Sequence, residues 1–242
     1  MSIEEICKKY SIENYTINED NTIDVEGDVV LSSKGIDKLP LIFNKVTGDF
    51  TLSSNGLTTL EGCPKWIGGR FTCDTNNLTN LKGGPVYVMG DFFCNRNFIT
   101  SLEGGPKEVV GFYYCDNNRL TNLKGSPEEI KNNFNCGDNI LTSLEGCPKK
   151  IEGTFDCYNN ELYEFDFIPE WIGKQIFIDG NPIESISYKM GIDLLRAFKS
   201  YKVLKDKTIN LKRLKYVMSE FNKPINIEAV SYTHLTLPTS YA

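Results

Sequence analysis

The architecture of this chain follows from the stretch Phe71-Thr72-Cys73-Asp74-Thr75-Asn76-Asn77-Leu78-Thr79-Asn80-Leu81, because variants of it recur every 21 residues. A cysteine takes the third position of each copy, and an asparagine follows three residues later. A fixed period of this length is typical of repeat proteins in which each copy stacks on the next. The cysteines are Cys73, Cys94, Cys115, Cys136 and Cys157, and the asparagines are Asn76, Asn97, Asn118, Asn139 and Asn160.

The copies share the frame Pro-x-x-Ile/Val-x-Gly-x-Phe-x-Cys-x-x-Asn-x-Leu-x-x-Leu. Phe71 and Cys73 alternate with outward residues, as in a β-strand, so strands of successive copies can pair in parallel about 4.8 Å apart. The glycines and the proline before each strand disfavour a helix, so we expect an extended or polyproline-like return segment. The frame therefore predicts an α/β fold, a solenoid of about eight rungs over residues 25–187 with one parallel strand per rung.

The motif Phe71-x-Cys73-x-x-Asn76-x-Leu78 resembles the conserved half of a leucine-rich repeat, with cysteine where leucine is common. The proline and the short period are similar to the bacterial type. Over residues 1–229 the chain also resembles leucine-rich repeat proteins encoded by tailed phages. The resemblance implies a solenoid and, for a phage protein, the cytoplasm of the host cell. It implies little about function, since different sites occur on one frame.

Both ends depart from the repeat. Ser2 and Glu5 have the spacing of a capping box, and a hairpin is expected after that helix, so residues 1–24 are predicted to form an N-terminal cap. From residue 188 the apolar period becomes helical, which predicts a C-terminal helical cap over 188–229. Residues 230–239 resemble a translated sequencing adapter from a metagenomic read, so 230–242 are excluded from the fold prediction.

Composition argues against catalysis and against a membrane protein. The 242 residues are 40% hydrophobic and 24% charged, without a signal-like start or a run of about 18 apolar residues, so we expect a cytoplasmic monomer with reduced thiols. The single histidine, His234, lies in the adapter-like segment. No Ser-His or Cys-His pair, phosphate-binding Gly-Lys loop or dinucleotide fingerprint remains. We predict no enzymatic activity and no cofactor.

The cysteine column has two interpretations. Five thiols in a row could bind metal, but buried cysteine also behaves as a small hydrophobic residue. The chain has no CxxC pair, and parallel side chains fit disulfide geometry poorly. We therefore predict a structural column without metal.

A partner-binding surface is predicted on the outward strand positions, which differ between rungs. Phe93, Phe112 and Tyr114 fall on adjacent central rungs and, by strand alternation, on one face. Exposed aromatic rings with arginine at the rim are typical of interface cores, although such rings could also only shield the sheet. The predicted partner-binding residues are Arg70, Asp91, Phe93, Arg96, Phe112, Tyr114 and Tyr158.

The C-terminal segment is basic. Residues 189–223 carry ten Lys/Arg and three Asp/Glu, a local charge of +7 that leaves −13 for the rest of a chain whose total is −6. This asymmetry favours either nucleic-acid or acidic-partner binding, or a solvated helix face that suits the acidic solenoid. A third hypothesis is a targeting module of a larger effector whose further domain followed residue 229. The primary prediction is a non-enzymatic protein–protein interaction module.

Overall fold

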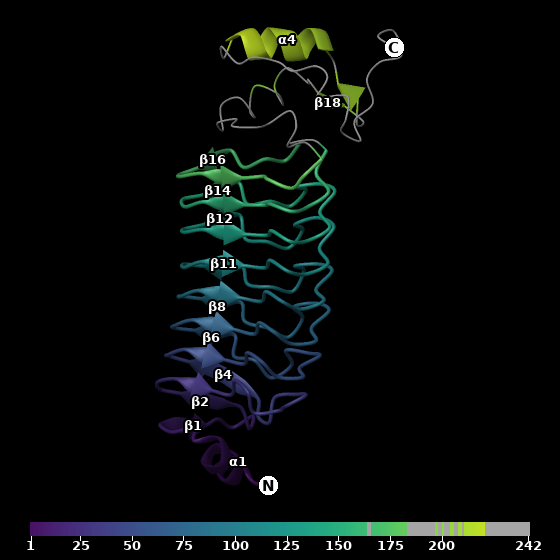
Figure 1. Ribbon diagram of the computed structural model, residues 1–242. Coiled ribbons are helices and arrows are strands. Elements are labelled where there is room, and N and C mark those ends of the chain that lie inside the picture. Colours follow the sequence, from purple (N-terminus) through teal and green to yellow (C-terminus); the bar gives the residue numbers. More distant parts are fainter. Residues whose placement is uncertain are drawn as a thin grey trace.

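The chain coils into a stack of similar turns (Figure 1). Each turn corresponds to one 21-residue repeat and contributes short strands to two ladders of parallel strands. The predicted parallel solenoid is therefore confirmed. The computed structural model describes residues 1–163, 166–182, 197, 200, 204–205, 208–209 and 211–220.

A helix and a hairpin precede the first turn, as predicted. The Ser2 hydroxyl accepts the N–H of Glu5 while the Glu5 carboxylate accepts the N–H of Ser2, which is the expected capping box. Cys7 and Ile12 are buried in the same core as the repeats, so this segment covers one end of the stack. The elements are α1 (Ile3–Tyr10), β1 (Tyr15–Ile17) and β2 (Ile23–Val25), with β1 antiparallel to β2.

The predicted strand of each rung joins one eight-stranded parallel sheet. In most of these strands the first residue is buried and the second is partly exposed, because neighbouring side chains of a strand point to opposite faces. The strands are β3 (Val29–Val30), β5 (Phe50–Thr51), β7 (Phe71–Thr72), β9 (Phe92–Phe93), β11 (Tyr113–Tyr114), β13 (Phe134–Asn135), β15 (Phe155–Asp156) and β17 (Ile176–Phe177).

The return segment is extended and carries a second short strand in most rungs, which the sequence did not predict. Ile67 and its equivalents point inward from these strands, while Trp66 and its equivalents point outward. One such sheet contains β4 (Phe43–Val46), β6 (Trp66–Ile67), β8 (Tyr87–Val88) and β10 (Glu108–Val109) after β1 and β2. A three-stranded sheet contains β12 (Glu129–Ile130), β14 (Lys150–Ile151) and β16 (Trp171–Ile172).

Glycine occupies the corner between the two ladders in most rungs, although Asn132 and Lys174 stand at the same repeat position. The Gly90 N–H donates to the Gly69 carbonyl at 2.9 Å, which brings the backbones of adjacent rungs together. A Cβ built on Gly90 would lie 2.6 Å from the carbonyl carbon of Gly69. The recurring glycine of the frame is therefore explained by close backbone approach.

The core consists of side-chain columns with one member per rung. Ring centroids lie 5.4 Å apart between Phe71 and Phe92, and 4.8 Å apart between Phe92 and Tyr113. The column of five cysteines is fully buried beside these rings. Tyr113 occupies a position that is phenylalanine on both sides, and its hydroxyl is buried with no hydrogen-bond partner in the described part of the chain.

Buried asparagines join each rung to the preceding one. The Asn76 amide nitrogen donates to the carbonyls of Leu52 and Cys73 at 3.0 and 3.1 Å, and its oxygen accepts the N–H of Leu57 at 3.1 Å. The same pattern recurs at Asn97, Asn118, Asn139, Asn160 and Asn181. These amides satisfy backbone groups in turns that are closed off from water.

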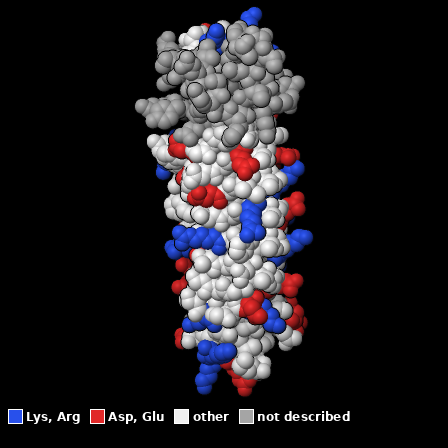
Figure 2. All heavy atoms as spheres, turned by 45° about the vertical axis from the view of Figure 1, so that its right-hand side comes forward, with Lys and Arg blue, Asp and Glu red and all other residues white. Residues whose placement is uncertain are grey.

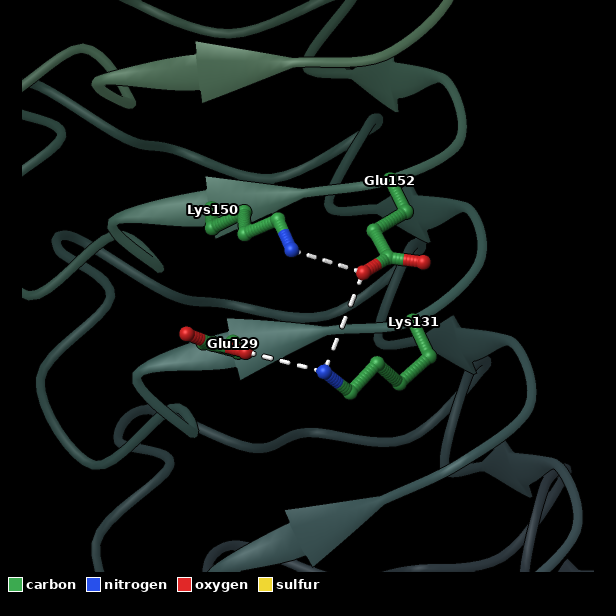
Figure 3. Close-up of polar contacts among 4 residues, drawn as sticks. All are labelled: Glu129, Lys131, Lys150 and Glu152. Atoms are coloured by element: carbon green, nitrogen blue, oxygen red, sulfur yellow. Dashed lines mark hydrogen bonds and ion pairs between the residues drawn. The ribbon is translucent and has the colours of Figure 1, made fainter.

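Ion pairs cross between rungs at the outer surface. Lys131 lies 3.0 Å from Glu129 and 3.7 Å from Glu152, and Lys150 lies 2.8 Å from Glu152 (Figure 3). Exposed pairs of this kind contribute about 0–1 kcal/mol each, so they favour register more than stability. Charges of both signs are interspersed over the face shown in Figure 2.

The C-terminal segment is described only in part. α4 (Leu211–Glu220) confirms one predicted helix, with Leu214, Val217 and Met218 buried. β18 (Leu204–Lys205) pairs antiparallel with β19 (Thr208–Ile209). The rest of the helical cap predicted over 188–229 lies almost entirely outside the described residues, as does the adapter-like segment. No helix in the described ranges is long and apolar enough to cross a membrane.

Candidate partner-binding surface

The predicted aromatic residues meet on the outer face of the eight-stranded sheet. Phe93 and Tyr114 are register partners on β9 and β11, with ring centroids 5.2 Å apart. Phe112 lies just before β11, and its ring centroid is 5.6 Å from that of Tyr114. All three side chains are half-buried. We call Phe93, Phe112 and Tyr114 the aromatic patch, and its predicted arrangement is confirmed.

Asp91 has a structural role that the sequence did not reveal. Its Oδ1 accepts the backbone N–H of Phe112 at 2.9 Å, and its Oδ2 lies 3.5 Å from Nε of Arg70. Asp49 and Asn133 accept the equivalent N–H of the next rung in the same way. The signal was present in the sequence, since Asp28, Asp49, Asp91 and Asn133 share one repeat position. Arg70 and Asp91 therefore form an ion pair with each other at the margin of the aromatic patch.

Arg96 occupies the left-handed position of its rung. Its φ is 53°, and every neighbouring rung has a positive φ at the equivalent residue. Its N–H donates to the Asp116 carbonyl at 3.1 Å, and its side chain is exposed. Left-handed backbone favours asparagine, aspartate or glycine, so arginine is not selected there by conformation.

Tyr158 is separated from the aromatic patch by one rung. Its ring lies over Gly137, where an added Cβ would overlap the ring, so glycine is needed beneath it. The Tyr158 hydroxyl donates to Asp138, and burial together with nearby carboxylates raises the pKa of Tyr158 to about 12. The structure therefore places Tyr158 among acidic residues and not among the predicted aromatic ones.

A group of carboxylates next to the aromatic patch was not predicted as a site. We call Asp116, Asp138, Asp156 and Asp179 the carboxylate cluster. Burial, followed by the charges of Asp116, Asp179 and Asp138, raises the pKa of Asp156 to about 6. Burial also raises the pKa of Asp116, although the Arg96 charge opposes the shift. The repeat pattern alone does not reveal that the charges of these residues act on one another.

Hydrogen bonding in the carboxylate cluster is uneven. Asn117 donates to Asp116 at 2.9 Å, and Asn159 donates to Asp138 at 2.9 Å. Oδ1 of Asp156, by contrast, is buried and has no hydrogen-bond partner in the described part of the chain. Buried polar atoms are nearly always paired, so Asp156 holds its charge at a cost to the fold.

The cysteine column offers neither a nucleophile nor ligands in a metal-binding arrangement. Its thiols are free and buried, and burial raises the pKa of each well above the ordinary range, which keeps them protonated. Cys115 donates to the Asn135 carbonyl at 3.4 Å. Across the described residues, no group of three or more His, Cys, Asp or Glu side chains could hold a metal ion.

Most of the described residues of the basic segment belong to α4. Lys212, Arg213 and Lys215 are exposed on this helix. The side chains of the remaining Lys/Arg of residues 189–223 lie outside the described part of the chain. The structure therefore does not describe how the positive charges of this segment are arranged.

Comparison of the chain with protein-family models gives no match, and comparison with curated proteins gives no significant match.

Proposed function

We propose that this protein is a non-enzymatic binding module that holds a partner protein on the outer face of its eight-stranded sheet, with the aromatic patch as the anchor. The proposal rests on the contact of half-buried rings from adjacent rungs. The repeat does not need rings at these positions, because the equivalents of Phe93 and Tyr114 include Thr51, Thr72 and Asn135. Phe177 is a further ring in this column, two rungs beyond Asn135. Aromatic residues of this kind dominate binding energy at protein interfaces.

We also infer membership of the leucine-rich repeat family. The inference is supported by the Phe-x-Cys-x-x-Asn-x-Leu motif and by the asparagine ladder that joins successive rungs. Variation of outward residues on such a rigid frame is a common way to make a binding surface.

The test replaces Phe93 and Tyr114 together by threonine, the residue found at these positions in two other rungs. Tyr87→Thr, which removes an exposed ring from the other ladder, is the matched control. Partners are captured from a bacterial lysate, identified by mass spectrometry and then titrated in purified form. We expect the double variant to lose at least about tenfold in affinity, since a hot-spot residue contributes about 2 kcal/mol or more.

Folding of the double variant is measured in parallel by urea denaturation. We expect its stability to stay within about 1 kcal/mol of the parent, because the replaced rings are half-buried and outward. Unchanged affinity in a folded double variant, or an equal loss in Tyr87→Thr, would show that the aromatic patch is not the anchor.

A second candidate function is nucleic-acid or acidic-partner binding through the basic segment. It is favoured by the local charge of +7 over residues 189–223 and by the exposed Lys212, Arg213 and Lys215 of α4. We expect weak duplex binding, no tighter than about 10⁻⁵ M near physiological salt, because the rest of the chain is acidic. Submicromolar duplex binding that falls steeply with salt, and that is lost on deleting residues 189–229, would make this the primary function.

A further inference from the structure

The aromatic patch continues into the carboxylate cluster on the same face. Tyr114, Asn135 and Asp156 are successive register partners on β11, β13 and β15. At about 4.8 Å per rung, Tyr114 and Asp156 are about 10 Å apart, with Asp116 and Tyr158 in a neighbouring column. A single extended peptide segment can therefore contact rings and carboxylates together.

The described strands and turns of this part of the face carry no basic side chain. Residues 112–117, 133–138, 154–159 and 175–180 include all four members of the carboxylate cluster and no lysine or arginine. Arg96, on the preceding rung, is the cation whose charge opposes the raised pKa of Asp116. The three-stranded sheet differs, since Glu129 and Glu152 are paired with Lys131 and Lys150 (Figure 3). Glu128, just before this sheet, is paired with Lys149.

The carboxylate cluster consequently presents negative charge that, within the described part of the chain, Arg96 offsets only in part. Asp156 has one buried oxygen without a partner, and it is ionised above pH about 6. Like charges gathered on a partly buried surface oppose folding unless a cation offsets them. A ligand that fits this surface brings positive charge to the carboxylates and an apolar group to the rings.

Resting on the proposed protein-binding function, we propose that the partner presents an arginine-containing segment, with guanidinium groups over the carboxylate cluster and a neighbouring apolar side chain on the aromatic patch. Arginine fits better than lysine because its planar fork matches carboxylates in a bidentate manner and also stacks on aromatic rings. The net charge of −6 would also steer a basic segment toward this protein.

The probe is a synthetic peptide that alternates leucine and arginine, titrated by fluorescence anisotropy against the full chain. A peptide that alternates leucine and glutamate is the charge control. The protein variant carries Asp116→Asn and Asp156→Asn. Asparagine is compatible with the position of Asp156, because Asn135 is its register partner on the preceding rung. Glu108→Gln removes an exposed carboxylate from the other ladder and is the matched control.

We expect the arginine peptide to bind the parent and Glu108→Gln equally, and to bind the Asp116→Asn/Asp156→Asn variant at least about tenfold more weakly, as loss of two charge-assisted contacts implies. Binding should weaken from pH 7.5 to pH 5 as Asp156, which faces Asp116, Asp138, Asp179 and Tyr158, becomes protonated. Thermal melts of the variants serve as the check that they fold.

Any of four outcomes overturns the inference. Equal binding of the glutamate peptide, or unchanged binding by the Asp116→Asn/Asp156→Asn variant, removes the electrostatic basis. Self-association in sedimentation that this variant abolishes would assign the surface to a second copy. The proposed function is tested separately. If a partner protein is lost by the Phe93→Thr/Tyr114→Thr variant but still binds the Asp116→Asn/Asp156→Asn variant, the aromatic patch remains the anchor and the arginine segment is rejected.

Discussion

Replacing Asn76 by alanine tests whether the asparagine ladder holds adjacent rungs together. The substitution removes donors from the carbonyls of Leu52 and Cys73 and the acceptor of the Leu57 N–H. Each lost hydrogen bond costs about 1 kcal/mol, and more where the remaining group stays buried without a partner. The sum predicts a loss of about 3 kcal/mol in the free energy of unfolding, a large share of the roughly 5–15 kcal/mol typical of a domain.

The neighbouring Asn77 provides the matched control, because its side chain is exposed and Asn77→Ala leaves the ladder intact. Urea denaturation is followed by tryptophan fluorescence in a Trp171→Phe background, so that Trp66 reports from the mutated rung. The urea midpoint should fall strongly for Asn76→Ala. For Asn77→Ala, the free energy of unfolding should change by less than about 0.5 kcal/mol. Equal midpoints for the two variants would refute the assignment of rung cohesion to the buried amide.

Three further variants probe the core, the corner and the charged face. Tyr113→Phe should raise stability by about 1 kcal/mol, seen as a higher Tm, because it deletes a buried hydroxyl that has no partner; a lower Tm would contradict this. Gly90→Ala should cost more than about 2 kcal/mol because its Cβ meets Gly69 backbone, whereas Gly56→Ala, with its nearest atom at 3.7 Å, should be tolerated in the same melts. Asp156→Asn should raise stability at pH 7.5 by about 1 kcal/mol, after allowance for solvent screening. The pKa of Asp156 is about 6 in the folded chain against an ordinary 3.8, so the native state binds more protons between these values. Stability of the parent should therefore fall as pH rises from about 4 to 6, and a pH dependence that is unchanged in Asp156→Asn urea midpoints would refute the assignment.

The aromatic patch could be predicted because its geometry follows from strand alternation alone. Once Phe92 and Cys94 are placed inside, Phe93 must point outward, and the fixed period brings Tyr114 beside it. The same reasoning could not show that Asp91 caps a backbone N–H, because that bond depends on where the next rung passes.

Sequence alone is enough to predict the repeat, the inward columns and the recurring asparagine, because these depend on period and on local hydrogen-bonding needs. The second short strand found in most rungs depends on tertiary structure, since a segment of mixed Pro, Gly and Ile pairs only when a neighbouring rung offers its backbone. It also decided the chemistry of the carboxylate cluster. Asp116 and Asp156 lie 40 positions apart in the sequence, and only the stacking of rungs brings their charges close enough to raise the pKa of Asp156.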